Sequence, residues 1–331
     1  MFLWRETGSP IPGFRFSSYH CTNNFTDFIH LVHRMADHFS TVVNKLDESF
    51  SPQDSHQYGL AVLFSEVSFS YCILDFKRNK YLGLHQVLRS DAAQRRMPQH
   101  PRTTGDDFFR NIFLSAPWLK NEYKVTRLAW ESGWSTLVPA GLFDPDEKER
   151  YLNLTIHPGP DEQVFADHLL PMDAYQVFSV PNQILNTMKG YFPKVKIVHH
   201  SSVLIESIWL NYKNRINTSR TFLQVRDRYF DLMIFDGRQM SYFNSFQFHN
   251  HEDIVYYLIF VLEQLNFNPE SMPLVLLGNT EKGGSLAELL TRYVRHVEFG
   301  RRNEGFKYSY LFNQVAHHAH YPLMNFLSCG L

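Results

Sequence analysis

The order of predicted elements between residues 220 and 294 limits the possible folds of this chain more than any other feature. The segment predicts strands at residues 221–226, 229–236 and 240–246, a helix after residue 250, a strand at 274–277 and a helix at 285–294. Asp236 and Gly237, between the second and third strands, favour a tight hairpin. Asn250, with Asp253 three positions later, indicates a capped helix start. The resulting order is βββαβα.

An earlier part of the chain repeats this order. It predicts strands at residues 58–64, 68–76 and 81–87, a helix at 106–115 and a strand at 124–130. The two parts share no useful sequence identity, so the repeat lies in the order of elements alone. It predicts two similar halves, each with a three-strand antiparallel meander that leads into parallel strands.

Between these units, strand and helix patterns alternate. Residues 135–138 predict a strand paired with residues 124–130, and residues 156–162 predict an irregular linker rich in proline. The other expected elements are a helix at 145–152, a strand at 174–180, a helix at 181–191, a strand at 195–199 and a helix at 201–213. Such alternation favours parallel pairing through right-handed crossovers.

The two ends of the chain differ from its middle. Residues 25–46 favour a helix because their apolar residues form one stripe; the segment is either a docking helix or upstream sequence added by a wrongly chosen start. Residues 300–331 suit either a short terminal helix or an interaction segment. The predicted domains are an N-terminal extension and linker (1–55), a first half (56–216), a second half (217–299) and a C-terminal tail (300–331).

Composition excludes several classes of function. The 331 residues carry a net charge of −1 and no basic stripe, which disfavours nucleic-acid binding through phosphates. No apolar run is long enough for membrane insertion. Three distant cysteines and a start without the features of a signal peptide predict a reducing, cytoplasmic location.

Four segments carry a family resemblance: residues 58–75, 137–143, 242–246 and 253–265. They resemble a family of uncharacterised proteins from Bacteroides-type bacteria, a domain of unknown function. That family is similar to the actin-like ATPase fold and to the adaptor proteins of type IV pilus and type II secretion platforms. The resemblance covers residues 47–299. It implies an α/β fold of two similar ribonuclease-H-like halves, each with a mixed sheet flanked by helices, that face each other across a cleft.

The resemblance also implies where a nucleotide would bind. An actin-like ATPase holds Mg²⁺ and phosphates with acidic, glycine-rich turns between the first two strands of each half. Here the first turn offers Glu66 and no glycine, and the second offers Asp227 among bulky residues. We expect Arg226 and Arg228 to pair with Asp227 and to occupy the place of the metal. Glu66 and Asp227 are alternatively ordinary turn residues.

A third candidate segment contains Gly278, Gly283 and Gly284, between a strand and a helix. In the resembled fold, a glycine-rich turn at this place contacts the nucleoside, and glycines near a helix start can present N–H groups to an anion. A Walker A loop is rejected because Gly284 stands where that motif requires lysine. The alternative is a helix-start loop with permissive glycines. Together with Glu66 and Asp227, these glycines are the predicted, vestigial cofactor-binding residues.

No catalytic residue is identified from the sequence. The 17 histidines form clusters, such as His199 with His200, but none has the spacing of a metal site, so we expect no metal. Neither Cys72 nor Cys329 has the context of a catalytic triad.

The sequence therefore predicts a non-catalytic or weakly nucleotide-binding actin-like module, a pseudo-ATPase, that acts through contacts with an unidentified protein partner and needs no cofactor. One alternative is a functional ATP-binding protein with slow, Mg²⁺-dependent hydrolysis. A second alternative is a carboxylate-dependent hydrolase, which requires several acids at the ends of strands.

Overall fold

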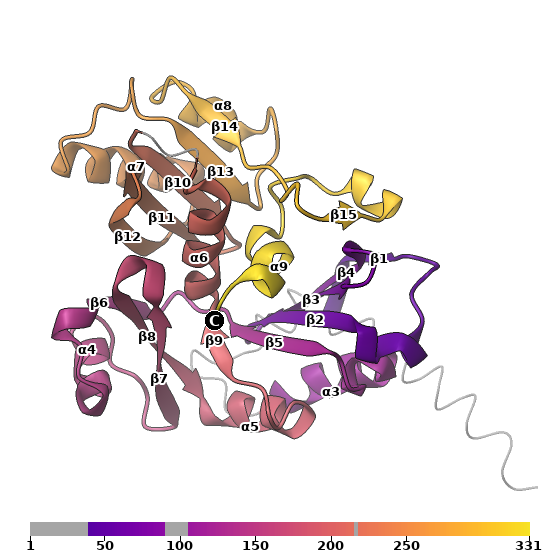
Figure 1. The fold of residues 1–331 in the computed structure, drawn as a ribbon. Helices are drawn as coiled ribbons and strands as arrows, with labels where there is room; N and C mark the ends of the chain where they lie inside the picture. Colours follow the sequence, from indigo (N-terminus) through magenta and orange to yellow (C-terminus); the bar gives the residue numbers. More distant parts are fainter. Residues whose placement is uncertain (1–38, 90–104, 215–217) are drawn as a thin grey trace, which may run out of the picture.

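The computed structural model describes residues 39–89, 105–214 and 218–331, which form two large sheets, one small sheet and the helices between them (Figure 1). The strands of the first sheet are β1 (Phe39–Leu46), β2 (Tyr58–Phe64), β3 (Ser68–Asp75), β4 (Lys80–Arg89), β5 (Val125–Trp130), β9 (Ile197–His199) and β15 (Lys307–Tyr308). Their order is β1-β4-β3-β2-β5-β9, and β15 pairs with β4.

The second sheet repeats the central part of the first. Its strands are β10 (Arg220–Val225), β11 (Tyr229–Asp236), β12 (Gln239–Gln247), β13 (Leu274–Gly278) and β14 (Val297–Phe299). Their order, β12-β11-β10-β13-β14, corresponds strand by strand to β4-β3-β2-β5-β9. The strands β1 to β4 of the first sheet and β10 to β12 of the second pair antiparallel, and the later strands of both sheets pair parallel. The predicted pair of similar halves is confirmed.

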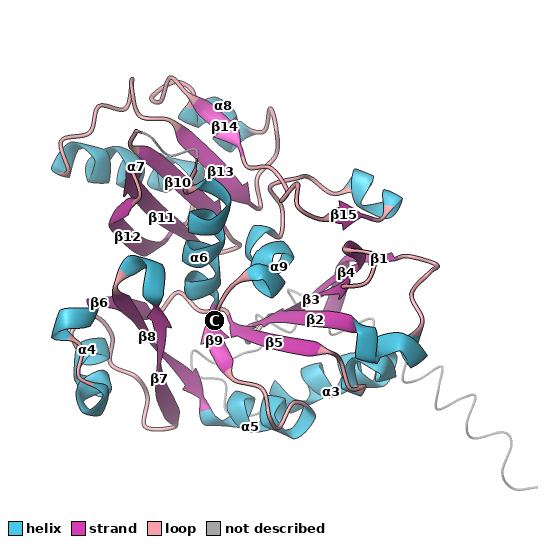
Figure 2. Ribbon diagram, viewed as in Figure 1, coloured by secondary structure: helices cyan, strands magenta, loops and turns pink. Residues whose placement is uncertain are grey.

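Helices cover both faces of both large sheets (Figure 2). They are α3 (Gly105–Ser115), α5 (Asn182–Tyr191), α6 (His200–Tyr212), α7 (His251–Gln264), α8 (Ser285–Leu290) and α9 (Tyr321–Asn325). Residues of α3 and α5 share a core with one face of the first sheet, and residues of α7 and α8 share a core with one face of the second. Because α6 and α9 pack on the remaining faces, they lie between the two halves.

The local sequence explains these elements. All five residues of β13 are buried, which is why it reads as a continuous apolar run. All eight residues of β3 are buried too, although they include Ser68, Ser70 and Asp75. The start of α7 is capped as predicted: the Asn250 side chain accepts from the Asp253 N–H at 2.9 Å, and the Asp253 carboxylate accepts from the Asn250 N–H at 3.3 Å.

A third, smaller sheet lies between β5 and α5 in the chain. It contains β6 (Ser135–Pro139), β7 (Glu162–Leu169) and β8 (Ala174–Pro181), in the order β6-β8-β7, and is covered by α4 (Lys148–Asn153). The predicted pairing of residues 135–138 with 124–130 is wrong, because β2 and β9 already occupy both edges of β5. The sequence analysis also missed β7, which begins where the predicted linker ends.

The ends of the described chain both join the first sheet. The predicted helix over residues 25–46 is wrong for residues 39–46, which form β1 on the free edge of β4; its earlier part lies outside the described residues. In the tail, a short terminal helix is observed as α9. Tyr81 Oη donates to the Met324 carbonyl at 2.6 Å, and Cys72 Sγ donates to the Leu323 carbonyl at 3.3 Å, so α9 covers the first sheet.

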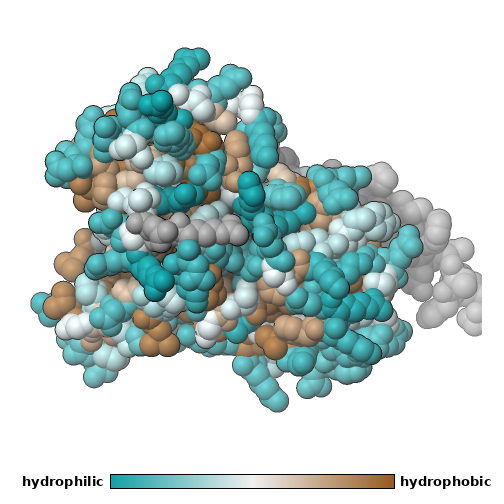
Figure 3. Space-filling view, turned by 45° about the horizontal axis from the view of Figure 1, so that its top comes forward, coloured by the Kyte–Doolittle hydropathy of each residue, from teal (hydrophilic) through white to brown (hydrophobic). Residues whose placement is uncertain are grey.

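Short 3-10 helices complete the connections. They span Pro52–Gln57, Pro117–Lys120, Ala140–Leu142, Pro145–Glu147, Leu170–Met172, Tyr310–Gln314 and Phe326–Ser328. The predicted helix at 145–152 is observed as the 3-10 helix Pro145–Glu147 followed directly by α4. Across the ranges that the structure describes, every helix is too short or too polar to cross a membrane. Hydrophobic side chains are scattered among hydrophilic ones on the face that Figure 3 shows.

Candidate functional site

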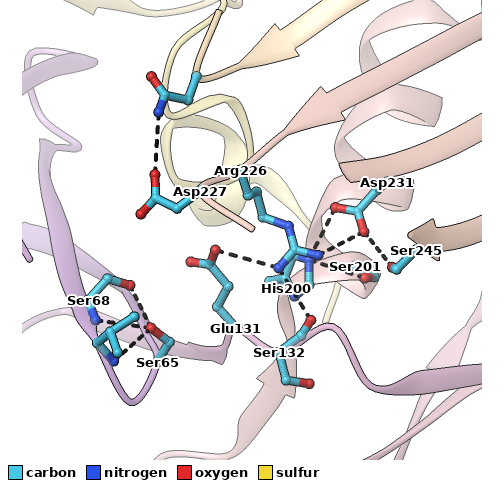
Figure 4. Close-up of polar contacts among 12 residues, drawn as sticks. Ser65, Ser68, Glu131, Ser132, His200, Ser201, Arg226, Asp227, Asp231 and Ser245 are labelled. Atoms are coloured by element: carbon cyan, nitrogen blue, oxygen red, sulfur yellow. Dashed lines mark hydrogen bonds and ion pairs between the residues drawn. The ribbon is translucent and has the colours of Figure 1, made fainter. Parts of the chain in front are cut away.

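Four connections meet at the carboxyl ends of the central strands, where the two halves face each other. They are the β2–β3 turn (residues 65–67), the loop after β5 (131–134), the β10–β11 turn (226–228) and the loop after β13 (279–284). Ligands of open α/β sheets commonly bind at this edge. Polar contacts within and between these connections make it the candidate site (Figure 4).

Arg226 bridges the two halves. Its Nη2 donates to Asp231 Oδ1 at 3.0 Å within the second half, and its Nη1 lies 3.6 Å from Glu131 Oε1 of the first half. The same Nη1 donates to the Ser132 carbonyl at 3.3 Å. Burial by itself lowers the pKa of Arg226, but Asp231 and Glu131 outweigh it and raise the pKa, so the guanidinium is charged.

Asp231 is the buried anion of this network. Its side chain has no exposed area, accepts from Ser245 Oγ at 2.5 Å and lies 3.3 Å from His200 Nε2. Burial raises the pKa of Asp231, yet Arg226 and His200 lower it more, and the carboxyl has a pKa well below its usual range. A carboxylate this deep in the protein requires such partners.

The geometry of the hairpin decides which carboxylate Arg226 meets. The Arg226 N–H donates to the Tyr229 carbonyl at 2.9 Å, so these two residues face each other across the turn. Asp231 is two positions beyond Tyr229 and lies on the same face of the hairpin as a diagonal neighbour. Asp227 is at the exposed tip and accepts from Asn279 Nδ2 at 3.3 Å. The expected pairing of Arg226 with Asp227 is therefore wrong.

Tyr229 closes the space beside Arg226. A Cβ atom added to Gly133 would lie 2.3 Å from Cε1 of Tyr229, so the tyrosine ring packs directly on the loop backbone. The Trp134 ring meets the Tyr229 ring edge to face, with 6.0 Å between centroids. The Arg226 guanidinium lies 5.5 Å from the centre of the same ring. A side chain at position 133 would therefore displace the Tyr229 ring from the loop.

The first turn satisfies its own backbone donors. Ser65 Oγ accepts the N–H of Ser68 at 3.0 Å and the N–H of Val67 at 3.3 Å, and it lies 2.8 Å from Ser68 Oγ. An anion bound at this turn would have to replace the Ser65 hydroxyl. Glu66 beside it is half-buried; burial raises its pKa, and the charge of Arg89 opposes that rise.

The three glycines have structural roles. Gly278 has φ +82°, and a Cβ there would lie 2.1 Å from the Val225 carbonyl oxygen, so the close pairing of these two residues at the end of β10 and β13 requires glycine. Gly283 has φ +73° and open space around it, and Gly284 is the N-cap of α8. The structure thus places Asp227, through Asn279, beside Gly278, with Glu66 on the facing half. Their role with a cofactor stays a prediction.

Ser132 and His199 form a second polar pair at the site. Ser132 Oγ lies 3.1 Å from His199 Nε2, and His199 Nδ1 accepts the Ser201 N–H at 3.3 Å. Since Nδ1 is an acceptor, the proton of the neutral ring is on Nε2 and points to Ser132. Burial, His200 and Arg226 keep the pKa of His199 well below its usual value. Ser132 therefore faces a hydrogen-bond donor and not a base that would activate it.

The sequence analysis missed Glu131, Asp231 and the partner role of His200. One signal was available: Asp231 is a charged residue inside the apolar run of β11, where only a paired carboxylate is stable. The described residues contain no group of three or more histidine, cysteine or acidic side chains close enough to hold a metal ion.

Comparisons with known proteins agree with this architecture. Residues 47–297 match the model of a family described as "Protein of unknown function (DUF3822)". The chain belongs to this family. Among curated proteins, the DUF3822 sequence has no match.

Solved structures share the fold of this DUF3822 protein, and two of them match it over most of the chain. One is a protein of actin-like ATPase fold and unknown function from Bacteroides thetaiotaomicron, with 21% identity and a TM-score of 0.71, covering 85% of this chain and 99% of that one. The other is the PilM–PilN type IV pilus biogenesis complex, with 11% identity and a TM-score of 0.54, covering 80% of this chain and 96% of that one. The DUF3822 chain has the actin-like ATPase fold.

At the two turns where the resemblance places phosphates, residues 65–67 and 226–228, the residues present do not fit a magnesium triphosphate. The Ser65 hydroxyl takes the backbone N–H groups of the first turn, and the Arg226 side chain lies between the halves beside the second. Asp227, the acid of the second turn, is exposed and bonded to Asn279. Mg²⁺ requires nearly ideal octahedral coordination, usually by carboxylates, phosphates and water.

Proposed function

We propose that this DUF3822 protein is a non-catalytic actin-like module that acts through protein contacts. The observation that carries the proposal is the position of Arg226. Its side chain is 9% exposed and bonds Asp231 of the second half together with Glu131 and Ser132 of the first half. A cation therefore holds the halves together at the level where the fold would bind phosphates.

The energy of this contact opposes nucleotide entry. Removing one partner from a buried ion pair typically costs about 3–5 kcal/mol. A nucleotide that displaced Arg226 from Asp231 would lose a comparable free energy, which corresponds to a factor of about 10² to 10³ or more in affinity. Phosphoryl transfer depends on positioning and on stabilising charge, and both require turns that approach the phosphates closely.

The proposal assigns this fold a role in contacts with another protein. A protein with the same fold, PilM, is in a complex with PilN. We propose that the DUF3822 chain likewise binds another protein. No observation on this chain identifies PilN as its partner.

Calorimetric titration of the full chain with Mg-ATP, beside a phosphate-release assay, tests the proposal. We expect binding weaker than about 1 mM, which is a free energy smaller in magnitude than about 4 kcal/mol, and no hydrolysis above background. Asp227→Ala and Asp146→Ala, both at exposed positions, form the matched pair of variants. Micromolar binding that only Asp227→Ala abolishes would establish the alternative, a functional ATP-binding protein.

A further inference from the structure

Helix α7 has two apolar faces, and the structure covers only one of them. Nine consecutive apolar or aromatic residues, 254–262, form its middle. Ile254 and Leu258 have no exposed area and belong to the core of the second half, whereas Tyr256 is 64% exposed and Phe260 is 47% exposed. A helix that is apolar all round is normally covered on every side.

The exposed face of α7 lines a groove of about 360 Å³. Its α7 wall is a stripe of residues 252, 255, 256, 259, 260 and 263, spaced three and four apart along one side of the helix. Leu289 and Tyr293, in and after α8, form the other wall. Because α7 and α8 cover the face of the second sheet opposite α6, the groove is separate from the Arg226 network.

The charges of the groove select its occupant. Among the residues that the structure describes, the only charged ones that line it are Glu252 and Glu263, at the two ends of the stripe. They are eleven residues apart, which is about 16 Å along a helix. Two carboxylates repel the phosphates of a nucleic acid or of an anionic lipid surface. They attract a partner with a basic residue at each end of an apolar segment.

We propose that this groove binds a short amphipathic helix of a partner protein, about three turns long, with Lys or Arg at both ends. Apolar side chains at positions i, i+3, i+4 and i+7 of the partner pack against Tyr256, Phe260 and Tyr293, in the helix-in-groove mode. The inference rests on the proposed function, since it names the class of partner, but it concerns a different part of the molecule.

Selection from a displayed library of random 16-residue peptides on the immobilised full chain tests this proposal. Enriched peptides are then synthesised, and their affinities are measured by fluorescence anisotropy. We expect them to carry apolar residues at helical spacing between basic residues about eleven positions apart. Enrichment of acidic peptides, or no enrichment, would overturn the proposal.

Two pairs of variants locate the binding site. Phe260→Ser should weaken binding at least about ten-fold, as expected for an aromatic residue in a hot spot, while Leu142→Ser, at another exposed apolar position, leaves it unchanged. Glu263→Lys should weaken binding of basic-ended peptides at least about five-fold, while Glu270→Lys does not. Equal binding by Phe260→Ser and Leu142→Ser would contradict the assignment of the groove.

Two further measurements separate the possible outcomes. If sedimentation shows a dimer that Phe260→Ser dissociates, a second copy occupies the groove and the proposal is wrong. Calorimetry with Mg-ATP, set beside the peptide anisotropy, distinguishes the two proposals. Micromolar ATP binding would remove the proposed non-catalytic function and leave peptide binding intact, whereas loss of peptide binding alone removes only the inference about the groove.

Discussion

Arg226 donates to Asp231 at 3.0 Å across its own hairpin, and the same guanidinium contacts Glu131 and Ser132 of the first half. The Asp231 side chain has no exposed area, while that of Arg226 is 9% exposed. Each of these buried charges is stabilised by the other, and Arg226 also lies 3.6 Å from Glu131 of the first half. The effects of the Arg226–Asp231 pair on stability and on pH dependence can be measured separately.

Removal of the Arg226 charge should strongly destabilise the fold. Arg226→Met leaves Asp231 buried without its cation, so we expect a loss of about 3–5 kcal/mol in the free energy of unfolding, measured with denaturant. Arg150→Met is the matched control, because Arg150 pairs with Glu147 on the surface with 79% of its side chain exposed. The control should lose less than about 1 kcal/mol. Equal losses in the two variants would show that the Arg226 pair is not buried in solution.

The pH dependence follows from the lowered pKa of Asp231. In the unfolded chain an aspartate binds a proton near about pH 3.9, whereas the folded Asp231 stays ionised to lower pH. Its contribution to stability is therefore fully present above the unfolded pKa and is lost as the pH falls towards the folded pKa. The difference in unfolding free energy between the natural chain and Asp231→Asn should shrink between about pH 5 and about pH 3. A difference independent of pH would contradict the lowered pKa.

Contact between Gly133 and Tyr229 should appear as a coupling between two substitutions. Gly133→Ala places a methyl group against the Tyr229 ring, where 2.3 Å is available, so we expect a loss of about 1–3 kcal/mol. In the double variant with Tyr229→Ala the methyl group has room. The loss of unfolding free energy in the double variant should therefore be smaller than the sum of the losses in the two single variants. Thermal unfolding of the four chains gives the coupling energy. Strict additivity would mean that the loop and the ring are apart in solution.

Leu258 tests the packing of α7. Its side chain has no exposed area in the core of the second half, so Leu258→Ala should cost about 2–5 kcal/mol. Tyr256→Ala, on the exposed side of the same helix, should cost less than about 1 kcal/mol. Denaturant unfolding of both variants provides the comparison. A larger loss for Tyr256→Ala than for Leu258→Ala would reverse the assigned faces of the helix.

The sequence was informative where the order of local elements determines topology. The two βββαβ runs were enough to predict two sheets of the same strand order, because short antiparallel connections and longer crossovers leave few alternatives. The prediction from sequence failed where the pairing of a strand depends on which edge of a sheet is free. The apolar stripe that favoured a helix ends at Phe39, whereas Thr41 and Val43 after it are β-branched and the edge of β4 was available.

The candidate site was predicted in place but not in its contacts. The turns with Glu66 and Asp227 do lie at the meeting point of the halves, as the resemblance implied. The partners of Arg226 come from a strand and from a loop nearly a hundred residues away, and no local pattern specifies such a meeting. Alternation along β11 alone would have placed Asp231 on the Arg226 side of the hairpin.

The return of α9 to the first sheet has a consequence for folding during synthesis. Tyr81 and the Met324 carbonyl that it bonds are 243 residues apart in the chain. Ribosomes add about 5–20 residues per second, so this face of the first sheet waits for about 12–50 s before its covering helix exists. A nascent chain exposes this apolar surface throughout that interval. We therefore expect chaperones that bind unfinished chains to bind it.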